Sequence, residues 1–273
     1  MLWNKARRSS NVNDTREGKD ARTSKGKALA AGFAAFTLAG MGVYSTLAIT
    51  PEQGDILTED PYRQFVESIL GDTEDTWKQL FAQTGRQYNA PSLTLYSDGV
   101  SSGCGYAGAG SGPFYCPDNR QLYLDPEFFA QMARRFALVG DFAQAYVIAH
   151  EVGHHVQLQL GLSAPFDKAL AARERVAGDG GLEVRAELQA DCLAGVWAHH
   201  AQQRLDWLEP GDIEEALNAA TVFGDDYLQT AQQQTVRPDT FSHGTSQQRS
   251  RWFTAGFDSG RIDTCDTFAA TSL

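Results

Sequence analysis

Apolar residues recur every three or four positions in two long stretches of the chain, and this spacing predicts two long helices. The first stretch covers residues 141–160 and stops at Gly161, a residue type that commonly terminates helices. The second stretch covers about residues 182–203 and follows the glycine-rich segment 178–181. Small and apolar residues lie on several sides of both stretches, so we expect both helices to lie in the core.

Shorter patterns predict the elements around these helices. Helical spacing recurs before and after them, alternation of apolar and polar residues indicates two short strands, and an Asp-Pro pair marks a further helix start. We expect one helix at residues 61–84, with a break at Gly71-Asp72, another that begins at 125–126, and two or three more within 212–257. We expect strands at residues 92–96 and 121–124. The predicted fold class is therefore α+β, mostly helical with a small sheet ahead of the central helix.

Residues 28–50 form an uncharged stretch of 23 residues that is rich in Ala and Gly. A helix of this length spans the hydrocarbon core of a bilayer, roughly 30 Å thick, so the stretch predicts one N-terminal transmembrane helix. A cleaved signal peptide is the alternative, but residues 46–48 match a cleavage site poorly and the stretch is long for such a peptide. We therefore expect an uncleaved anchor in the lipid bilayer.

Charge is distributed unevenly around this stretch. Residues 1–27 carry eight Lys or Arg and three Asp or Glu, a net charge of +5, whereas the whole chain has a net charge of −11. Because basic residues flank membrane segments on the cytoplasmic side, we expect a single-pass membrane protein whose N-terminus is cytoplasmic. Its parts would be a cytoplasmic tail (1–27), an anchor (28–50), a linker (51–60) and a periplasmic or extracellular domain (61–273). The acidic domain argues against nucleic-acid binding.

The chain has four cysteines, an even number that is typical of disulfides in exported proteins. Cys104 and Cys116 flank a Gly- and Ser-rich loop that closes easily. Of the three possible pairings we expect Cys104–Cys116 and Cys192–Cys265. A metal site built on cysteines is the alternative, but the short C-x-x-C spacing of structural zinc sites is absent.

The central predicted helix carries the sequence His150-Glu151-Val152-Gly153-His154. Residues four positions apart lie on one face of a helix, so both imidazoles can bind the same metal ion. Glu151 points about 100° away and can reach water on the open side of that ion. Surface histidines on an ordinary amphipathic helix are the alternative, but the apolar neighbours indicate a buried segment, where unpartnered His and Glu are costly. We therefore expect His150 and His154 to bind zinc and Glu151 to act as the general base.

The second long helix offers the third protein ligand that a catalytic zinc site needs. Glu183, Glu187 and Asp191 are spaced four residues apart and share one face. A solvated acidic stripe is the alternative, but apolar residues surround these carboxylates, which repel one another unless a cation is near. We expect Glu187 to complete the site of one zinc ion per chain, and Asp191 to accept a hydrogen bond that orients His150.

Several segments of the chain resemble known metallopeptidases. His-Glu-x-x-His followed by a helical Glu-x-x-Ala-Asp is similar to the gluzincin metallopeptidases. More narrowly, four segments resemble the YpfJ-like family of bacterial neutral zinc metallopeptidases: GPFYCPDNRQLYLD (112–125), AHEVGHHVQ (149–157), ELQADCLAGVWA (187–198) and SHGTSQQRSRWF (242–253). The resemblance covers roughly residues 60–268 and includes the single N-terminal apolar segment, although the tail here is polar rather than glycine-rich. It implies a zincin-like peptidase domain with the ligands named above, and it implies that the membrane is a bacterial cell membrane.

The resemblance also implies a role for a histidine late in the chain. Gluzincins bring a late His or Tyr to the oxyanion of the transition state, so His243 is expected to donate a hydrogen bond there. Arg249, in the same segment, is a candidate partner for an acidic residue. We expect His155, His199 and His200 to be structural or exposed, because His155 points about 100° away from His154 and the other two lie two turns or more beyond Asp191.

The sequence therefore predicts a membrane-anchored zinc metalloendopeptidase that hydrolyses extracytoplasmic proteins or peptides. Zinc would polarise the scissile carbonyl, and Glu151 would move the proton of the attacking water to the leaving amine. The strand near 121–124 is expected to pair with an extended substrate. Two alternatives stay open: a protease-like scaffold without activity, and a zinc amidohydrolase acting on a non-peptide amide of the cell envelope. A deformylase-like site would need Cys104 as an unpaired ligand. The oligomeric state is left open.

Overall fold

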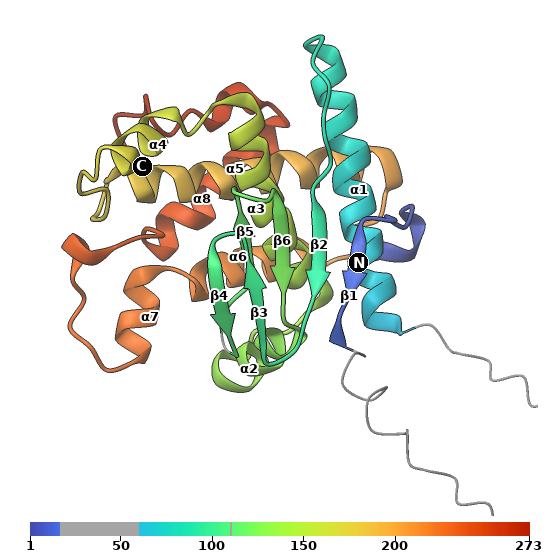
Figure 1. The fold of residues 1–273 in the computed structure, drawn as a ribbon, viewed down its shortest axis with the longest axis horizontal. Coiled ribbons are helices and arrows are strands. Elements are labelled where there is room, and N and C mark those ends of the chain that lie inside the picture. The colour runs from blue at the N-terminus through green and yellow to red at the C-terminus, as the bar shows by residue number, and fades with distance from the viewer. Residues whose placement is uncertain (17–59, 110) are drawn as a thin grey trace, which may run out of the picture.

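The computed structural model describes residues 1–16, 60–109 and 111–273, whose helices pack behind a small sheet (Figure 1). The helices are α1 (Pro61–Gln83), α2 (Pro126–Phe136), α3 (Asp141–Leu160), α4 (Ala164–Ala171), α5 (Leu182–Leu205), α6 (Asp212–Val222), α7 (Asp225–Ala231) and α8 (Ser246–Ser259). The strands are β1 (Val12–Asp14), β2 (Ser92–Leu95), β3 (Gly99–Ser102), β4 (Gly105–Gly108), β5 (Phe114–Cys116) and β6 (Gln121–Leu124). The folded domain is thus mostly helical with a small sheet.

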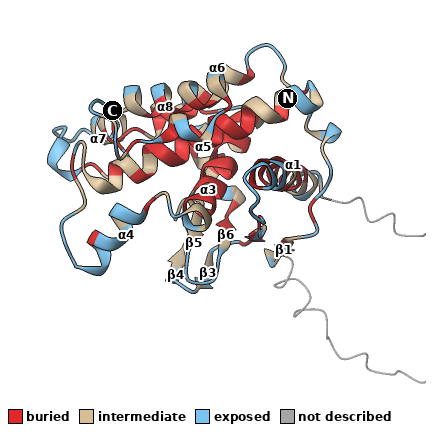
Figure 2. Cartoon of the chain, turned by 90° about the horizontal axis from the view of Figure 1, so that it is seen from above, coloured by how far each residue is buried: buried red, intermediate tan, exposed pale blue. Residues whose placement is uncertain are grey.

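Helices α3 and α5 form the centre of the domain, and Figure 2 shows that buried residues are concentrated in them. Helix α3 has the predicted bounds, and Gly161 ends it in the left-handed conformation with φ 70°. Gly153 lets the two helices approach closely, because a Cβ atom there would lie 3.0 Å from the carbonyl oxygen of Ala190 on α5. This approach sets the histidine-bearing face of α3 against the acidic face of α5.

Helix α1 is continuous, so the predicted break at Gly71-Asp72 is wrong. The N-terminal segment crosses the helix at Gly71, where a Cβ atom would lie 2.0 Å from the carbonyl oxygen of Arg7. Asp72 is buried and accepts a hydrogen bond from the indole of Trp197 on α5 at 2.8 Å. Gly71 and Asp72 therefore form packing contacts within a continuous helix and do not form a turn. The local sequence does not distinguish these two roles.

The main sheet has the strand order β1-β2-β6-β5, with parallel β1–β2 and β2–β6 pairs and an antiparallel β5–β6 pair. The strands predicted at 92–96 and 121–124 correspond to β2 and β6. Because β6 lies between two strands, the expectation that 121–124 pairs with a substrate is wrong; β5 is the strand at that end of the sheet. Strands β3 and β4 form a separate hairpin. The short elements β3, β4, β5 and α4 were not predicted, because a few residues do not establish a period.

Two disulfides join the four cysteines in the expected pairs. Their Cα atoms are 5.8 Å apart in Cys104–Cys116 and 5.5 Å apart in Cys192–Cys265. The first disulfide ties the turn of the β3–β4 hairpin to the end of β5, and the second ties α5 to the C-terminal segment. With its sulfur in a disulfide, Cys104 is not a metal ligand, so the deformylase-like site and the cysteine metal site are excluded.

The prediction of an N-terminal transmembrane helix is not supported. Within residues 1–16, 60–109 and 111–273, no helix combines the length and the apolar character that crossing a bilayer requires. The predicted anchor 28–50 lies outside the described residues. The bilayer partner and the single-pass location in a bacterial membrane therefore lose their support, and we correct both predictions.

Residues 1–16 lie in the same body as the rest of the described chain, although the predicted topology put them on opposite sides of a membrane. Strand β1 pairs with β2 in the main sheet. Arg7 forms ion pairs with Glu74 at 2.7 Å and Asp75 at 2.9 Å, both on α1. A chain that crossed a membrane once between residues 16 and 60 would separate these partners. The expected cytoplasmic N-terminus with an exported domain is therefore wrong.

Candidate active site

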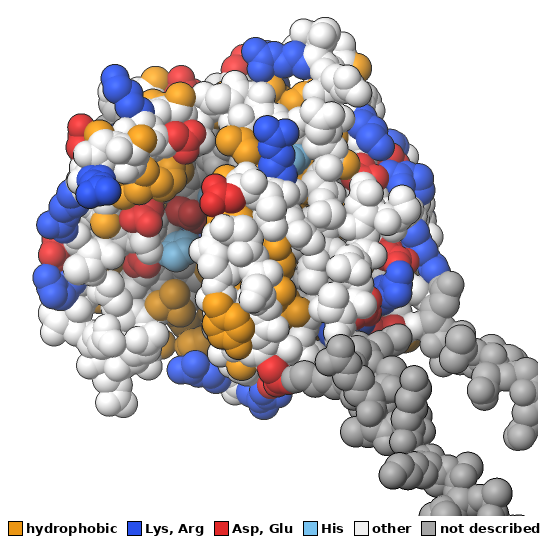
Figure 3. All heavy atoms as spheres, viewed as in Figure 1, with side chains coloured by type: hydrophobic (Ala, Val, Ile, Leu, Met, Phe, Trp, Pro, Cys, Tyr) orange, Lys and Arg blue, Asp and Glu red, His pale blue; other side chains and the backbone are white. Residues whose placement is uncertain are grey.

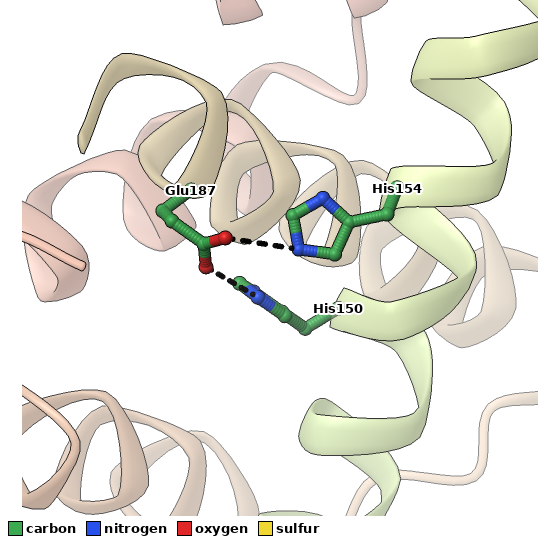
Figure 4. Close-up of side chains that lie close together, drawn as sticks. All are labelled: His150, His154 and Glu187. Carbon is green, nitrogen blue, oxygen red and sulfur yellow. Dashed lines mark hydrogen bonds and ion pairs between the residues drawn. The ribbon is translucent and has the colours of Figure 1, made fainter. Parts of the chain in front are cut away.

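Three side chains from α3 and α5 converge at one point (Figure 4). His150 and His154 lie one turn apart on α3, with ring centroids 4.8 Å apart. The Glu187 oxygens face both rings: Oε2 lies 3.1 Å from His150 Nε2, and Oε1 lies 3.4 Å from His154 Nε2. One ligand atom from each residue lies within 4.8 Å of the other two. Two imidazole nitrogens and one carboxylate are the donor set of a catalytic zinc site, so these residues fit that ion.

Hydrogen bonds on the far side of each imidazole determine which nitrogen faces Glu187. His150 Nδ1 lies 2.7 Å from Asp191 Oδ1, and His154 Nδ1 lies 2.9 Å from Gln157 Oε1. Both acceptors are oxygens, so each Nδ1 carries a hydrogen. Nε2 is therefore the nitrogen that can bind a metal once its own proton is displaced. Asp191 lies where the sequence predicted it. Gln157 was missed, and its position three residues after His154 on one helix face is the signal that could have identified it.

Burial and the neighbouring carboxylates act in opposite directions on the two imidazoles. Burial lowers the pKa of His150, but Asp191 and Glu187 outweigh this and raise it to about 10. The pKa of His154 is raised as well, because Glu187 again outweighs burial. Although burial raises the pKa of Glu187, the two imidazoles hold it well below its usual value. In the absence of a metal ion, the two imidazoles therefore bind protons, and these protons supply the positive charge beside Glu187.

We expect zinc to bind more tightly as the pH rises, because it must displace protons from His150 and His154. His150 has a pKa of about 10 in the metal-free protein, so its proton is still bound at neutral pH and is fully lost only above that value. Between pH 6 and 8 the apparent Kd should fall about tenfold per pH unit for each proton displaced. Competition with a chromophoric chelator measures this Kd. A Kd that does not change with pH would contradict the assigned ligands.

Glu151 lies beside the candidate metal ligands His150, His154 and Glu187, which we call the ligand cluster, and all four residues line one cavity. Burial raises its pKa, while the charges of His150 and His154 and the backbone of Tyr115 act in the opposite direction. A carboxylate with a raised pKa at the open side of a metal site is suited to exchanging a proton near neutral pH.

The ligand cluster lies in a cavity of about 560 Å³. Figure 3 shows this face hollowed, with histidine and acidic side chains inside the hollow and hydrophobic side chains above and below them. Apolar residues from α2, α3, α4, α7 and the segment after α6 line the cavity: Phe128, Val147, Leu158, Phe166, Phe223 and Leu228. The Phe128 and Phe223 rings stack with their centroids 5.8 Å apart. The cavity therefore offers a polar centre between two apolar ends.

Asp191 is fully buried and accepts hydrogen bonds from three side chains. Besides His150, the Tyr146 hydroxyl donates to Oδ1 at 2.5 Å, and Arg249 donates to both carboxylate oxygens at 2.8 and 2.9 Å. Although burial raises the pKa of Asp191, Arg249 and His150 hold it below its usual value. Asp191 is thus the acidic partner that the sequence analysis considered for Arg249. Tyr146 was missed, but it lies one turn before His150 and shares its helix face.

His243 lies on the loop before α8 and lines the same cavity, with 47% of its side chain exposed. Asp225 holds this loop, because its Oδ2 accepts the backbone N–H groups of residues 242–244 at 2.7–2.9 Å. Burial lowers the pKa of His243, but Asp225 and Glu187 raise it above its usual value. Asp225 was missed, since nothing in the local sequence links it to a loop seventeen residues later.

The other three histidines lie outside the ligand cluster. His155 is buried and lies 2.8 Å from the Tyr115 hydroxyl. His199 and His200 lie within hydrogen-bond distance of backbone carbonyls at the end of α8. These contacts agree with the structural roles expected for them.

A second acidic group in the described chain consists of Asp141, Asp212 and Glu215. The amino group of Met1 lies 2.9 Å from Asp141 and 3.2 Å from Asp212. An ammonium group therefore already neutralises these carboxylates, and the group contains no imidazole.

Comparison with known proteins agrees with the sequence motifs. The chain is 44% identical over 291 aligned residues to the uncharacterized protein YpfJ of Escherichia coli K12, an alignment that covers 98% of this chain and 99% of that protein. It is 42% identical over 207 residues to the uncharacterized protein Rv2575 of Mycobacterium tuberculosis H37Rv, covering 72% of this chain and 67% of that protein. No solved structure matches the chain.

The family itself is shown by a match along almost the entire chain. A family model described as "Putative neutral zinc metallopeptidase" matches residues 1–268. This range includes both helices of the ligand cluster and the N-terminal residues that pack against the domain. The chain therefore belongs to the neutral zinc metallopeptidase family.

Proposed function

We propose that this protein is a zinc-dependent endopeptidase with His150, His154 and Glu187 as metal ligands. One observation carries the proposal: two Nε2 atoms and a carboxylate converge within 4.8 Å in an open cavity. Family membership implies zinc. Three protein ligands leave a fourth position for water or substrate, which distinguishes catalytic from structural zinc sites. A scaffold without activity would need neither this open position nor Glu151 beside it.

The chemistry divides between the metal and the side chains around it. Bound zinc would polarise the scissile carbonyl and lower the pKa of a water molecule. Glu151 would accept a proton from the attacking water and transfer it to the leaving amine. Asp191 and Gln157 hold the two imidazoles with Nε2 toward Glu187, and Arg249 keeps Asp191 ionised.

We propose further that His243 donates a hydrogen bond to the oxyanion of the transition state. Its place on the cavity wall supports this role, as does the raised pKa that favours its protonated form. His243→Ala should lower kcat about 10²–10³-fold with little change in zinc content. His200→Ala, which removes a histidine outside the cavity, is the matched control. Steady-state kinetics measure the effect, and a His243→Ala protein with the wild-type kcat would exclude this role.

The decisive experiment is digestion of a peptide library by the purified full-length protein. The full chain is needed because residues 1–16 form part of the main sheet. Mass spectrometry of the products should show cleavage by the zinc-loaded protein, loss of cleavage after chelation and recovery when zinc is added back. A zinc-loaded protein that leaves every peptide intact would overturn the proposed function.

A further inference from the structure

Strand β5 lies at the end of the main sheet, and its middle residue faces the cavity. On β6, the Leu124 carbonyl accepts a hydrogen bond from Tyr96 N–H at 3.1 Å, on the side of β2. Backbone groups of successive strand residues point in alternating directions, so Tyr123 points toward β5, where it pairs with Phe114. Tyr115 follows Phe114 and therefore directs its N–H and C=O away from the sheet. Because Tyr115 also lines the cavity, its peptide groups lie at the open edge beside the site.

The Tyr115 side chain connects β5 to α3 through its contact with His155. Its hydroxyl lies 2.8 Å from His155 Nδ1, and the two rings meet edge to face with centroids 5.3 Å apart. His155 is 1% exposed, and its Nε2 lies 2.7 Å from the carbonyl oxygen of Asn89. A carbonyl oxygen only accepts, so the Asn89 contact favours a hydrogen on Nε2, with Nδ1 accepting from the tyrosine; the amide nitrogen of Gln159 also lies 2.7 Å from Nε2. Burial raises the pKa of Tyr115 to about 12, which keeps the hydroxyl protonated as a donor.

We propose that Tyr115 and His155 are positioning residues: their hydrogen bond holds β5 against α3, so that the Tyr115 N–H stays beside Glu151 and the Tyr115 C=O faces the bound peptide. The backbone of Tyr115 interacts with the Glu151 carboxyl group. Strand β5 has only three residues and is paired on one side in the main sheet, and the Cys104–Cys116 disulfide joins its end to the β3–β4 hairpin. The Tyr115–His155 contact adds a connection to α3 that neither of these provides. This inference rests on the proposed peptidase function.

Tyr115→Phe tests the inference by removing one hydroxyl group. We expect kcat/KM for peptides to fall about tenfold, mainly through kcat, which corresponds to one hydrogen bond. Tyr123→Phe is the matched control, because the Tyr123 hydroxyl lies on β6 and bonds to Gln121 at 3.0 Å instead of to α3. Zinc content and thermal midpoint should match in the two variants. Equal kcat/KM values in Tyr115→Phe and the wild type would overturn the inference.

Two substitutions of His155 separate positioning from packing. An asparagine amide lies near the place of Nδ1 and keeps an acceptor for Tyr115, whereas a glutamine amide reaches the place of Nε2 and keeps a donor for Asn89. We expect His155→Asn to retain kcat/KM within about threefold of the wild type and His155→Gln to lose about tenfold. Equal losses in both variants would show that His155 acts through packing alone and would overturn the inference.

The wild-type protein in the same assay separates the two proposals. If zinc-loaded wild type cleaves no peptide, the peptidase function itself is wrong. If wild type cleaves peptides and neither Tyr115→Phe nor His155→Gln changes kcat, only the positioning role is wrong.

Discussion

Replacement of Glu151 by glutamine should leave the protein folded and zinc-loaded but reduce kcat about 10³-fold. Glutamine has nearly the same shape as glutamate, but its amide cannot accept the proton of an attacking water. Burial raises the pKa of Glu151, so the wild-type carboxyl exchanges protons closer to neutral pH than an exposed glutamate does. Elemental analysis of the purified variant measures its zinc content, and steady-state peptide hydrolysis measures its kcat.

Glu174→Gln, at an exposed position after α4, provides the matched control for the loss of one carboxylate. This control should hydrolyse peptides at the wild-type rate. A zinc-loaded Glu151→Gln protein that retained more than about a tenth of the wild-type kcat would show that another group accepts the proton.

Glu187→Gln should abolish activity by a different route, through loss of the metal. The carboxylate supplies the anionic ligand and faces both imidazoles, so we expect zinc affinity to fall at least about 100-fold. Without this charge, the raised pKa values of His150 and His154 should also move back toward those of ordinary histidines. Chelator competition measures the affinity, and circular dichroism checks that the variant is folded.

Glu183→Gln is the matched control for this substitution, because Glu183 lies one turn earlier on α5 and outside the ligand cluster. It should bind zinc as the wild type does. If Glu187→Gln and Glu183→Gln bound zinc equally tightly, Glu187 would not be a ligand.

The N-terminal segment shows how a local pattern led to a wrong prediction. Basic residues followed by an uncharged stretch suggested a chain that crosses a membrane once. The pairing of β1 with β2 and the ion pairs of Arg7 with α1 place residues 1–16 in the folded domain instead. These partners lie more than fifty residues away along the chain, so no window of sequence contains both sides of the contact.

The short elements were missed for a related reason. Strand β5 has three residues, and its value to the site comes from its place at the end of the sheet and from the Tyr115–His155 contact. Likewise, Asp225 holds the loop of His243 through hydrogen bonds to its backbone. Hydrogen bonds to backbone groups and the order of strands in a sheet do not require particular residue types. They therefore produce no pattern that can be recognised in the sequence.

The amino-acid sequence alone was enough to place His150, His154 and Glu187 on long buried helices, because helical periodicity converts spacing along the chain into shared faces. It also identified Asp191 as the partner of His150, and it paired the four cysteines correctly. The register between α3 and α5, the edge position of β5 and the docking of residues 1–16 could be known only from the folded chain. They depend on packing between segments that are distant in sequence, and such packing is a property of the whole molecule rather than of any one segment.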